Sequence, residues 1–162
     1  EIDQWCRTLE MGCASLRNPE TKNFNAINLK SGEHTGHLTS ASFLCWYAGM
    51  GDKSMLDLLK NTLQDTLYPI PSLDKNSSKF DGLRYWRGPT WPILNALIGL
   101  GLSDMGHEKE AETIRSRTRE LISRHGFAEY FDPITGIPGG GKAFSWTAAV
   151  WLAWASPSVG AK

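Results

Sequence analysis

Apolar and polar positions along this chain alternate between two kinds of helical pattern. In the first kind, apolar residues recur on one face at helical spacing and charged residues fill the rest, as in residues 1–17, 53–67 and 108–125. In the second kind, almost no charge interrupts the apolar run, as in residues 38–50, 90–104 and 144–154. Outer and inner layers of a helical array require this alternation of half-buried and fully buried helices. We therefore expect an all-α protein.

Residue types at the helix ends support these boundaries. Asp52 precedes the second amphipathic pattern and is expected to cap it, since an Asp side chain accepts backbone N–H bonds at a helix start. Thr90 is expected to cap the next apolar helix, with Pro92 in its first turn, where the missing N–H costs nothing. A last apolar helix is expected to begin near Ser145.

The three apolar helices begin at regular intervals. They start near residues 38, 90 and 144, a repeat of about 52 to 54 residues that is typical of stacked helical hairpins. Each connection into an apolar helix has about 18 to 22 residues, whereas the connections out of these helices are short. Successive inner helices then run the same way, so the long loops share one rim. These loops are rich in aromatic residues, and we expect the rim to be a binding face.

Composition excludes several classes of function. Lys and Arg number 17, as do Asp and Glu, so no charge excess favours nucleic acid or an anionic membrane. No apolar run reaches the roughly 18 residues of a membrane span. The 162 residues fit one domain, 1–162, with a core of its own. The first residue is not Met and no signal peptide follows, so we expect the chain to begin inside a longer polypeptide.

Cysteine and histidine spacing predicts no metal site, and the sequence indicates no cofactor. Cys6, Cys13 and Cys45 are expected to be buried, inert thiols, which fits a reducing compartment and hence a cytoplasmic location. The four histidines also lack metal-ligand spacing; they are His34, His37, His107 and His125.

Glu129 is the first candidate for chemistry. It lies in a loop between Phe127 and the pair Tyr130–Phe131, and aromatic surroundings are one way to tune a carboxyl group for acid–base work. The alternative is that Glu129 only caps or forms a salt bridge. An aromatic stretch at residues 85–92 occupies the same position in the preceding repeat, which favours a shared site.

The glycine run before Lys142 lacks the spacing of a phosphate-binding loop. Either a mobile flap over the site or plain flexibility explains it. Lys142 itself is a candidate ligand contact.

Three ordered motifs resemble a known family. YWRGPTWP, GFAEYFDPITG and FSWTAA are similar to the C-terminal part of family 63 glycoside hydrolases, weakly before Asp81 and strongly from there to Ala153. That resemblance implies an (α/α)6-barrel of the six-hairpin glycosidase type. We count about six helices, half a barrel. The same resemblance implies inverting hydrolysis of α-glycosidic bonds in glucosides or small oligosaccharides.

The resemblance assigns roles to residues. Glu129 falls on the general-base position, and Tyr85, Trp86 and Trp91 match aromatics that shape the sugar pocket. Trp146 of the third motif is a further candidate substrate contact. Arg87 and Gly88 match the same loop as the aromatics, with a substrate contact and a structural role both open.

One part of the family's site has no match. The family's general acid is an Asp from the first half of the barrel, whereas Asp81 matches no acid motif and Asp132 reads as a turn residue. This chain is therefore expected to carry the base half of a site for a carbohydrate substrate. The alternative is a non-catalytic carbohydrate-binding or interaction module derived from the barrel. On either interpretation, the expected protein partner of this chain is a second copy or the missing barrel half.

Overall fold

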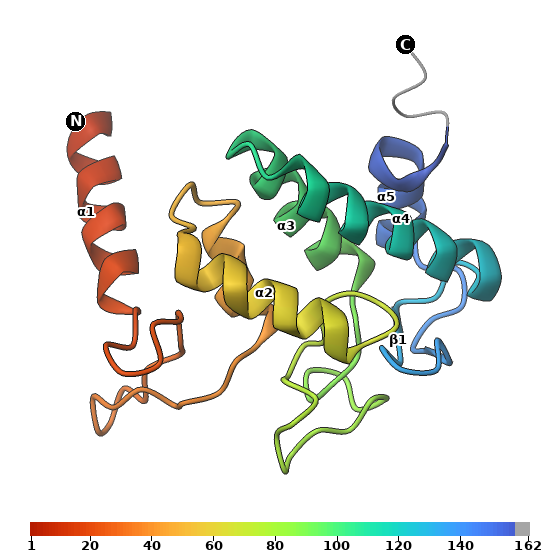
Figure 1. Cartoon of the computed structure of the whole chain (residues 1–162), viewed down its shortest axis with the longest axis horizontal. Helices are drawn as coiled ribbons and strands as arrows, with labels where there is room; N and C mark the ends of the chain where they lie inside the picture. Colours follow the sequence, from red (N-terminus) through yellow and green to blue (C-terminus); the bar gives the residue numbers. More distant parts are fainter. Residues whose placement is uncertain (158–162) are drawn as a thin grey trace.

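A computed structural model describes residues 1–157; the last five residues of the expected domain, 158–162, lie outside this range. The regular secondary structure of the described part is helical apart from one short hairpin, which confirms the all-α class (Figure 1). The elements in chain order are α1 (Ile2–Ser15), the 3-10 helix η1 (Ser40–Cys45), α2 (Lys53–Asp65), α3 (Pro92–Asp104), α4 (Glu108–His125), β1 (Tyr130–Phe131), β2 (Pro138–Gly139), α5 (Ser145–Val150) and the π-helical turn η2 (Trp151–Ala155). None of these helices is long and apolar enough to cross a membrane.

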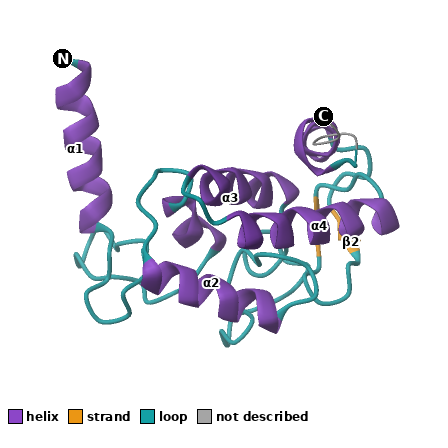
Figure 2. Ribbon diagram, turned by 45° about the horizontal axis from the view of Figure 1, so that its top comes forward, coloured by secondary structure: helices purple, strands orange, loops and turns teal. Residues whose placement is uncertain are grey.

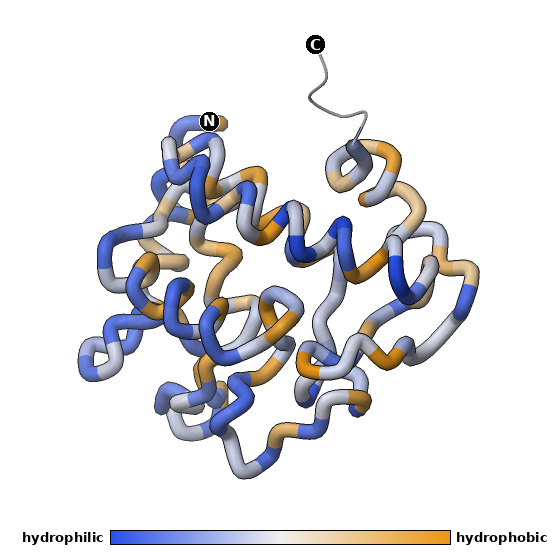
Figure 3. The backbone as a smooth tube through the Cα atoms, turned by 45° about the vertical axis from the view of Figure 1, so that its right-hand side comes forward, coloured by the Kyte–Doolittle hydropathy of each residue, from blue (hydrophilic) through white to orange (hydrophobic). Residues whose placement is uncertain are grey.

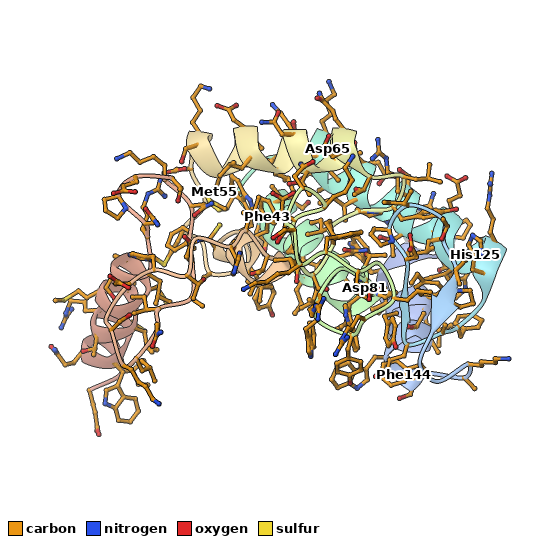
Figure 4. All side chains as sticks on the ribbon, turned by 90° about the horizontal axis from the view of Figure 1, so that it is seen from below. Phe43, Met55, Asp65, Asp81, His125 and Phe144 are labelled. Carbon is orange, nitrogen blue, oxygen red and sulfur yellow. The ribbon has the colours of Figure 1, made fainter. Side chains whose placement is uncertain are left out.

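Helix α3 is the centre of the packing. It contacts α4, η1 and α5, and its apolar sequence buries Ile98 and Leu102 completely. The core around it takes Phe43 from η1 and Met55 from α2, which Figure 4 shows close together in the interior. Trp154 enters from η2 and lies against Gly99, where a methyl group would come 2.4 Å from the indole ring. The inner and outer layers predicted from the sequence are present.

The outer helices end where the sequence predicts. The Asp52 side chain accepts the Met55 N–H at 3.0 Å, which confirms it as the α2 cap. Helix α4 spans Glu108–His125 and buries one narrow stripe that includes Ile114 and Leu121. Figure 3 shows hydrophobic and hydrophilic positions alternating along the helices. Helices α2 and α4 therefore each cover the core with one face only.

The three long connections lie on one side of the molecule. In Figure 1 the segments 16–39, 66–91 and 126–144 all lie below the helices that they connect, while the short turns lie toward the upper edge. Figure 2 shows β1 and β2 as a small hairpin within the third connection, paired antiparallel with Tyr130 opposite Gly139. The shared rim expected from the repeat is present.

The first apolar helix is much shorter than predicted. We expected a buried helix over residues 38–50, but only η1 forms, and Tyr47 is 57% exposed. The chain reverses where Gly49 adopts φ +69° and Gly51 lies against the Trp46 ring. Polar residues of the segment also act locally, since Thr39 and Ser42 form a capping box. The apolar run here forms a short, largely buried 3-10 helix followed by an exposed turn.

Helix α1 does not bury its apolar stripe. It projects away from the other helices in Figures 1 and 2, and it has no buried residue. Trp5 and Leu9 are 60% and 68% exposed. Its Cys6 is exposed and Cys13 is partly exposed, so the expectation of three buried thiols is wrong for these two. Only Cys45 is buried, and burial raises its pKa to about 12.

The cap of α3 differs from the prediction. Trp91 occupies the N-cap position and Pro92 the first helical position, so Thr90 lies one residue too early to cap. The Thr90 hydroxyl donates to the Pro69 carbonyl and accepts from the Asn95 amide, and its backbone forms bridges to Pro71 and Phe131. Thr90 therefore ties the second and third long connections together.

Candidate functional site

Two backbone hydrogen bonds bring the two aromatic motifs together. The Thr90 N–H donates to the Phe131 carbonyl at 2.8 Å, and the Phe131 N–H donates to Thr90 at 3.0 Å. Gly126, at φ +83°, ends α4 and turns the chain toward this bridge. Residues 85–91 and 129–131 therefore meet on the long-loop rim.

Both carboxylate oxygens of Glu129 accept hydrogen bonds. The Tyr85 hydroxyl donates to Oε1 at 3.1 Å, and the Gly141 N–H donates to Oε2 at 3.3 Å. The hydrogen bond to Glu129, some burial and the negative charge of Glu129 raise the pKa of Tyr85, in that order of importance. The carboxylate is partly exposed and held from two sides.

The glycine run supports this carboxylate directly. Gly141 accepts the Glu129 N–H at 2.9 Å, and Gly140 adopts φ +68°. A Cβ at Gly140 would lie 2.3 Å from Glu129 Oε2, so only glycine fits. The sequence suggested either a flap or plain flexibility for this glycine run. Its contacts with Glu129 give it another role, which is to support the carboxylate.

Four aromatic rings pack beside Glu129. Trp86 and Trp91 stack with centroids 4.4 Å apart and planes within 9°, and Tyr85 meets Trp91 edge-on at 5.0 Å. Tyr130 contacts both Tyr85 and Trp91. Trp91 is only 2% exposed, whereas Tyr85 and Trp86 are 49% and 53% exposed. Trp91 is thus the buried support, and Tyr85 and Trp86 form the accessible surface.

Arg87 and Gly88 serve the loop itself. Arg87 Nε donates to the Lys79 carbonyl at 3.1 Å, and its backbone carbonyl accepts the Asp81 N–H. Gly88 is buried, and a Cβ there would lie 2.4 Å from the Asp81 carbonyl oxygen. These contacts favour the structural alternative for both residues.

The third motif lies next to the segment that carries Glu129. The Thr147 hydroxyl donates to the Ala128 carbonyl at 2.7 Å, which anchors the start of α5 beside Glu129. Trp146 is 57% exposed and packs against Phe144 at 5.7 Å, and Lys142 is exposed. Figure 4 labels Phe144 on this loop and Asp81 on the preceding one, on the same side of the molecule. Trp146 and Lys142 are thus accessible from the rim.

Neither nearby Asp has the surroundings of a free acid. Asp132 Oδ1 accepts the N–H groups of Ile134 and Thr135, which is the turn role expected for it. Asp81 Oδ1 accepts the Leu83 N–H at 3.2 Å. Among residues 1–157, no cluster of His, Cys, Asp and Glu has the arrangement of a metal site.

Sequence reasoning missed Gly140, Gly141 and Tyr130 as parts of the site. The signal was available in principle, because a triple glycine following a turn and a Glu is compatible with a hairpin that closes on that Glu. The β1–β2 hairpin, however, is also paired with Thr90 through Phe131. That contact joins residues far apart in the sequence, so no local sequence pattern predicts it.

A comparison with protein-family models matches residues 1–147 to the mannosylglycerate hydrolase MGH1-like glycoside hydrolase domain. This chain belongs to glycoside hydrolase family 63. Mannosylglycerate hydrolases from Selaginella moellendorffii and Thermus thermophilus are each 35% identical over 95% of the chain. The chain spans 32% and 38% of their lengths, so it matches about a third of each.

Solved structures of family 63 agree with the fold. The Thermus thermophilus mannosylglycerate hydrolase bound to Tris and D-glycerate has a TM-score of 0.87 and 34% identity, covering 94% of this chain and 38% of that one. The same enzyme in complex with glucose has a TM-score of 0.86. This family 63 chain thus has the fold of part of a helical barrel.

Proposed function

We propose that this chain carries the general-base half of an inverting glycosidase site, with Glu129 as the base. The observation that carries the proposal is the Glu129 carboxylate, partly exposed and held by donors on both oxygens, beside the half-exposed Trp86 ring. A general base needs a fixed position within reach of the proton that it removes.

In this mechanism, Glu129 takes a proton from water as the water oxygen attacks the anomeric carbon. A carboxylic acid on the other side of the sugar protonates the leaving oxygen, which restores the charge balance. Inversion places the two carboxyl groups about 6.5–9.5 Å apart, leaving room for the water. Asp81 and Asp132 both accept backbone N–H bonds in turns, which supports an acid from outside this chain.

The substrate class follows from the aromatic surface and the relatives. Trp86 is covered by Trp91 on one face, so its exposed area is available to the apolar face of a sugar ring. The relatives from Selaginella moellendorffii and Thermus thermophilus are named mannosylglycerate hydrolases, and one solved structure of such an enzyme holds glucose. We propose α-mannosides and α-glucosides of small polar acceptors such as glycerate, with Tyr85, Trp86 and Trp146 facing the sugar.

The proposal is tested in a complete barrel. We define the hybrid barrel as the Thermus thermophilus hydrolase in which this chain replaces the segment that it matches. Glu129→Gln keeps the shape of the side chain but removes the base, so we expect turnover of mannosylglycerate or glucosylglycerate to fall about 10²–10⁴-fold. Binding of the substrate should largely persist, which calorimetry measures. Parental turnover by Glu129→Gln contradicts the assignment.

A second candidate function is carbohydrate binding without hydrolysis by this chain alone. The turn contacts of Asp81 and Asp132 favour it, because they leave Glu129 without an acid partner from either of the motifs. Titration of the chain with mannosylglycerate, followed by tryptophan fluorescence, measures binding independently of turnover.

A further inference from the structure

Tyr85 has an unfavourable backbone conformation. Its φ is +39°, a region that bulky L-residues rarely adopt. Surrounding contacts hold it there: the Trp91 indole N–H donates to the Tyr85 carbonyl at 3.1 Å, and the Tyr85 ring packs edge-on against Trp86, Trp91 and Tyr130. Strained backbone that surrounding contacts maintain is typical of functional sites.

This conformation directs one group at one target. The Tyr85 hydroxyl reaches Glu129 Oε1 at 3.1 Å, across 44 residues of sequence. Gly141 N–H holds Oε2, and the missing Cβ of Gly140 leaves space for that oxygen. Two donors, one per oxygen, fix the rotation of the carboxylate about its last bond, and each oxygen keeps a free lone pair. The ordinary tyrosine pKa of 10.0 already keeps the Tyr85 hydroxyl protonated at neutral pH, and the hydrogen bond to Glu129 raises that pKa further.

We propose that Tyr85 is a positioning residue for the general base: its hydroxyl orients the Glu129 carboxylate so that a free lone pair faces the attacking water. This inference rests on the proposed function of Glu129. The Tyr85 hydroxyl uses its only proton in the hydrogen bond to Glu129. A sugar hydroxyl in contact with Tyr85 would therefore have to be the donor. Tyr85 therefore acts on the reaction through Glu129, while its ring lines the surface.

The first test uses this chain as it is. Tyrosine labelled with ¹³C at Cζ gives one resonance for each of the four tyrosines, and Tyr85→Phe assigns the one from Tyr85. We expect the Tyr85 resonance to titrate above the ordinary tyrosine value of 10.0 and to move to lower pH in Glu129→Gln, because the charged acceptor is lost. A Tyr85 titration unchanged by Glu129→Gln overturns the proposal.

The second test measures kinetics in the hybrid barrel. Tyr85→Phe keeps the ring and removes the donor, so we expect kcat to fall about 10- to 100-fold with KM nearly unchanged, as misplacement of a catalytic group does. A rise in KM at constant kcat would mean that the hydroxyl reads the substrate directly, and it would overturn the proposal.

Tyr47→Phe is the matched control. Tyr47 is 57% exposed and its backbone lies against Gly101, ten residues along α3 from Trp91 and therefore about 15 Å away. It should leave kcat unchanged. Comparison with Glu129→Gln separates the two hypotheses: if Glu129→Gln is inactive while Tyr85→Phe keeps parental kcat, only the positioning role fails. If Glu129→Gln keeps parental turnover, the proposed function itself fails.

Discussion

At the scale of single residues, Gly140 shows how closely the glycine run fits the candidate base. It combines φ +68° with a Cβ direction that points at Glu129 Oε2, 2.3 Å away. An alanine there would be strained by its backbone and would also displace the carboxylate. Glu129 accepts hydrogen bonds from Tyr85 and Gly141, so the displacement would spread to the whole site.

Gly140→Ala is therefore expected to lower the free energy of unfolding by more than its backbone alone explains. The matched control is Gly32→Ala, at φ +74° with nothing within 4 Å of the added Cβ. The control should cost about 1–2 kcal/mol, the usual penalty for a left-handed L-residue. Gly140→Ala should exceed it by roughly 1–3 kcal/mol because of the overlap with Glu129. Urea unfolding of both variants measures the difference, and equal losses contradict the role given to Gly140.

Residue patterns predicted some parts of this site and not others. Glu129 was singled out as a candidate because a carboxylate among aromatics is chemically unusual, and its catalytic role stays a prediction. Asp132 was predicted to be a turn residue from the Pro that follows it, and its hydrogen bonds confirm this. Burial of Trp91 beneath Trp86 was not predictable, because both residues belong to one short aromatic motif. Which of two neighbouring rings turns inward depends on Tyr130, more than 35 residues later in the sequence.

At the scale of elements, local signals located helices wherever they were self-contained. The start of α2 depends on Asp52 and the whole of α4 on its polar surface and narrow apolar stripe, and both were predicted closely. The prediction of a long helix over residues 38–50 was wrong because apolar composition indicates burial without specifying a helix. For α1 the helix was predicted correctly, but its apolar stripe is exposed. Burial of a stripe requires a neighbouring element, which the helical pattern alone does not provide.

The start of α2 also joins that helix to the connection after α1. Asp52 Oδ2 pairs with Arg17 at 2.6 Å, and Arg17 lies over the Phe24 ring at 5.6 Å. Partial burial pulls the pKa of Asp52 upward. Hydrogen bonds from Met55 N–H and Ser54, together with Arg17, outweigh that effect, and the pKa lies below its ordinary 3.8.

Asp52→Ala is expected to lower the free energy of unfolding by about 1 kcal/mol at neutral pH, through loss of the cap. Asp52→Asn keeps a capping oxygen and isolates the contribution of the charge. Because the folded-state pKa is lowered, that contribution is present above pH 3.8 and is lost as the pH falls through the lower folded value. Urea unfolding from pH 7 to pH 2 measures it. A wild-type advantage over Asp52→Asn that grows toward low pH contradicts the assignment.

At the scale of the whole molecule, large apolar side chains remain exposed in two regions besides the long-loop rim. The first is the stripe of α1, and the second follows the inner helices, with Tyr47 57%, Leu100 43% and Leu152 73% exposed. Relatives that this chain matches are about three times as long. Apolar surface of this extent is typical of an association interface. The surroundings of these helices, in a complete barrel, would come from residues outside this chain.

The chain alone is accordingly expected to associate, most simply as a symmetric dimer, and to lack hydrolase activity. A dimer would cover the exposed inner-helix surface, but it would supply Glu129 twice and an acid from neither copy, given the turn contacts of Asp81 and Asp132. Sedimentation at micromolar concentration tests association. Leu152→Lys should weaken it, and Leu29→Lys, at a loop position that is 98% exposed, should not. Assays on α-glucosides, mannosylglycerate and glucosylglycerate test activity. A stable monomer refutes the first part, and turnover that disappears in Glu129→Gln refutes the second, since it would require an acid within these residues.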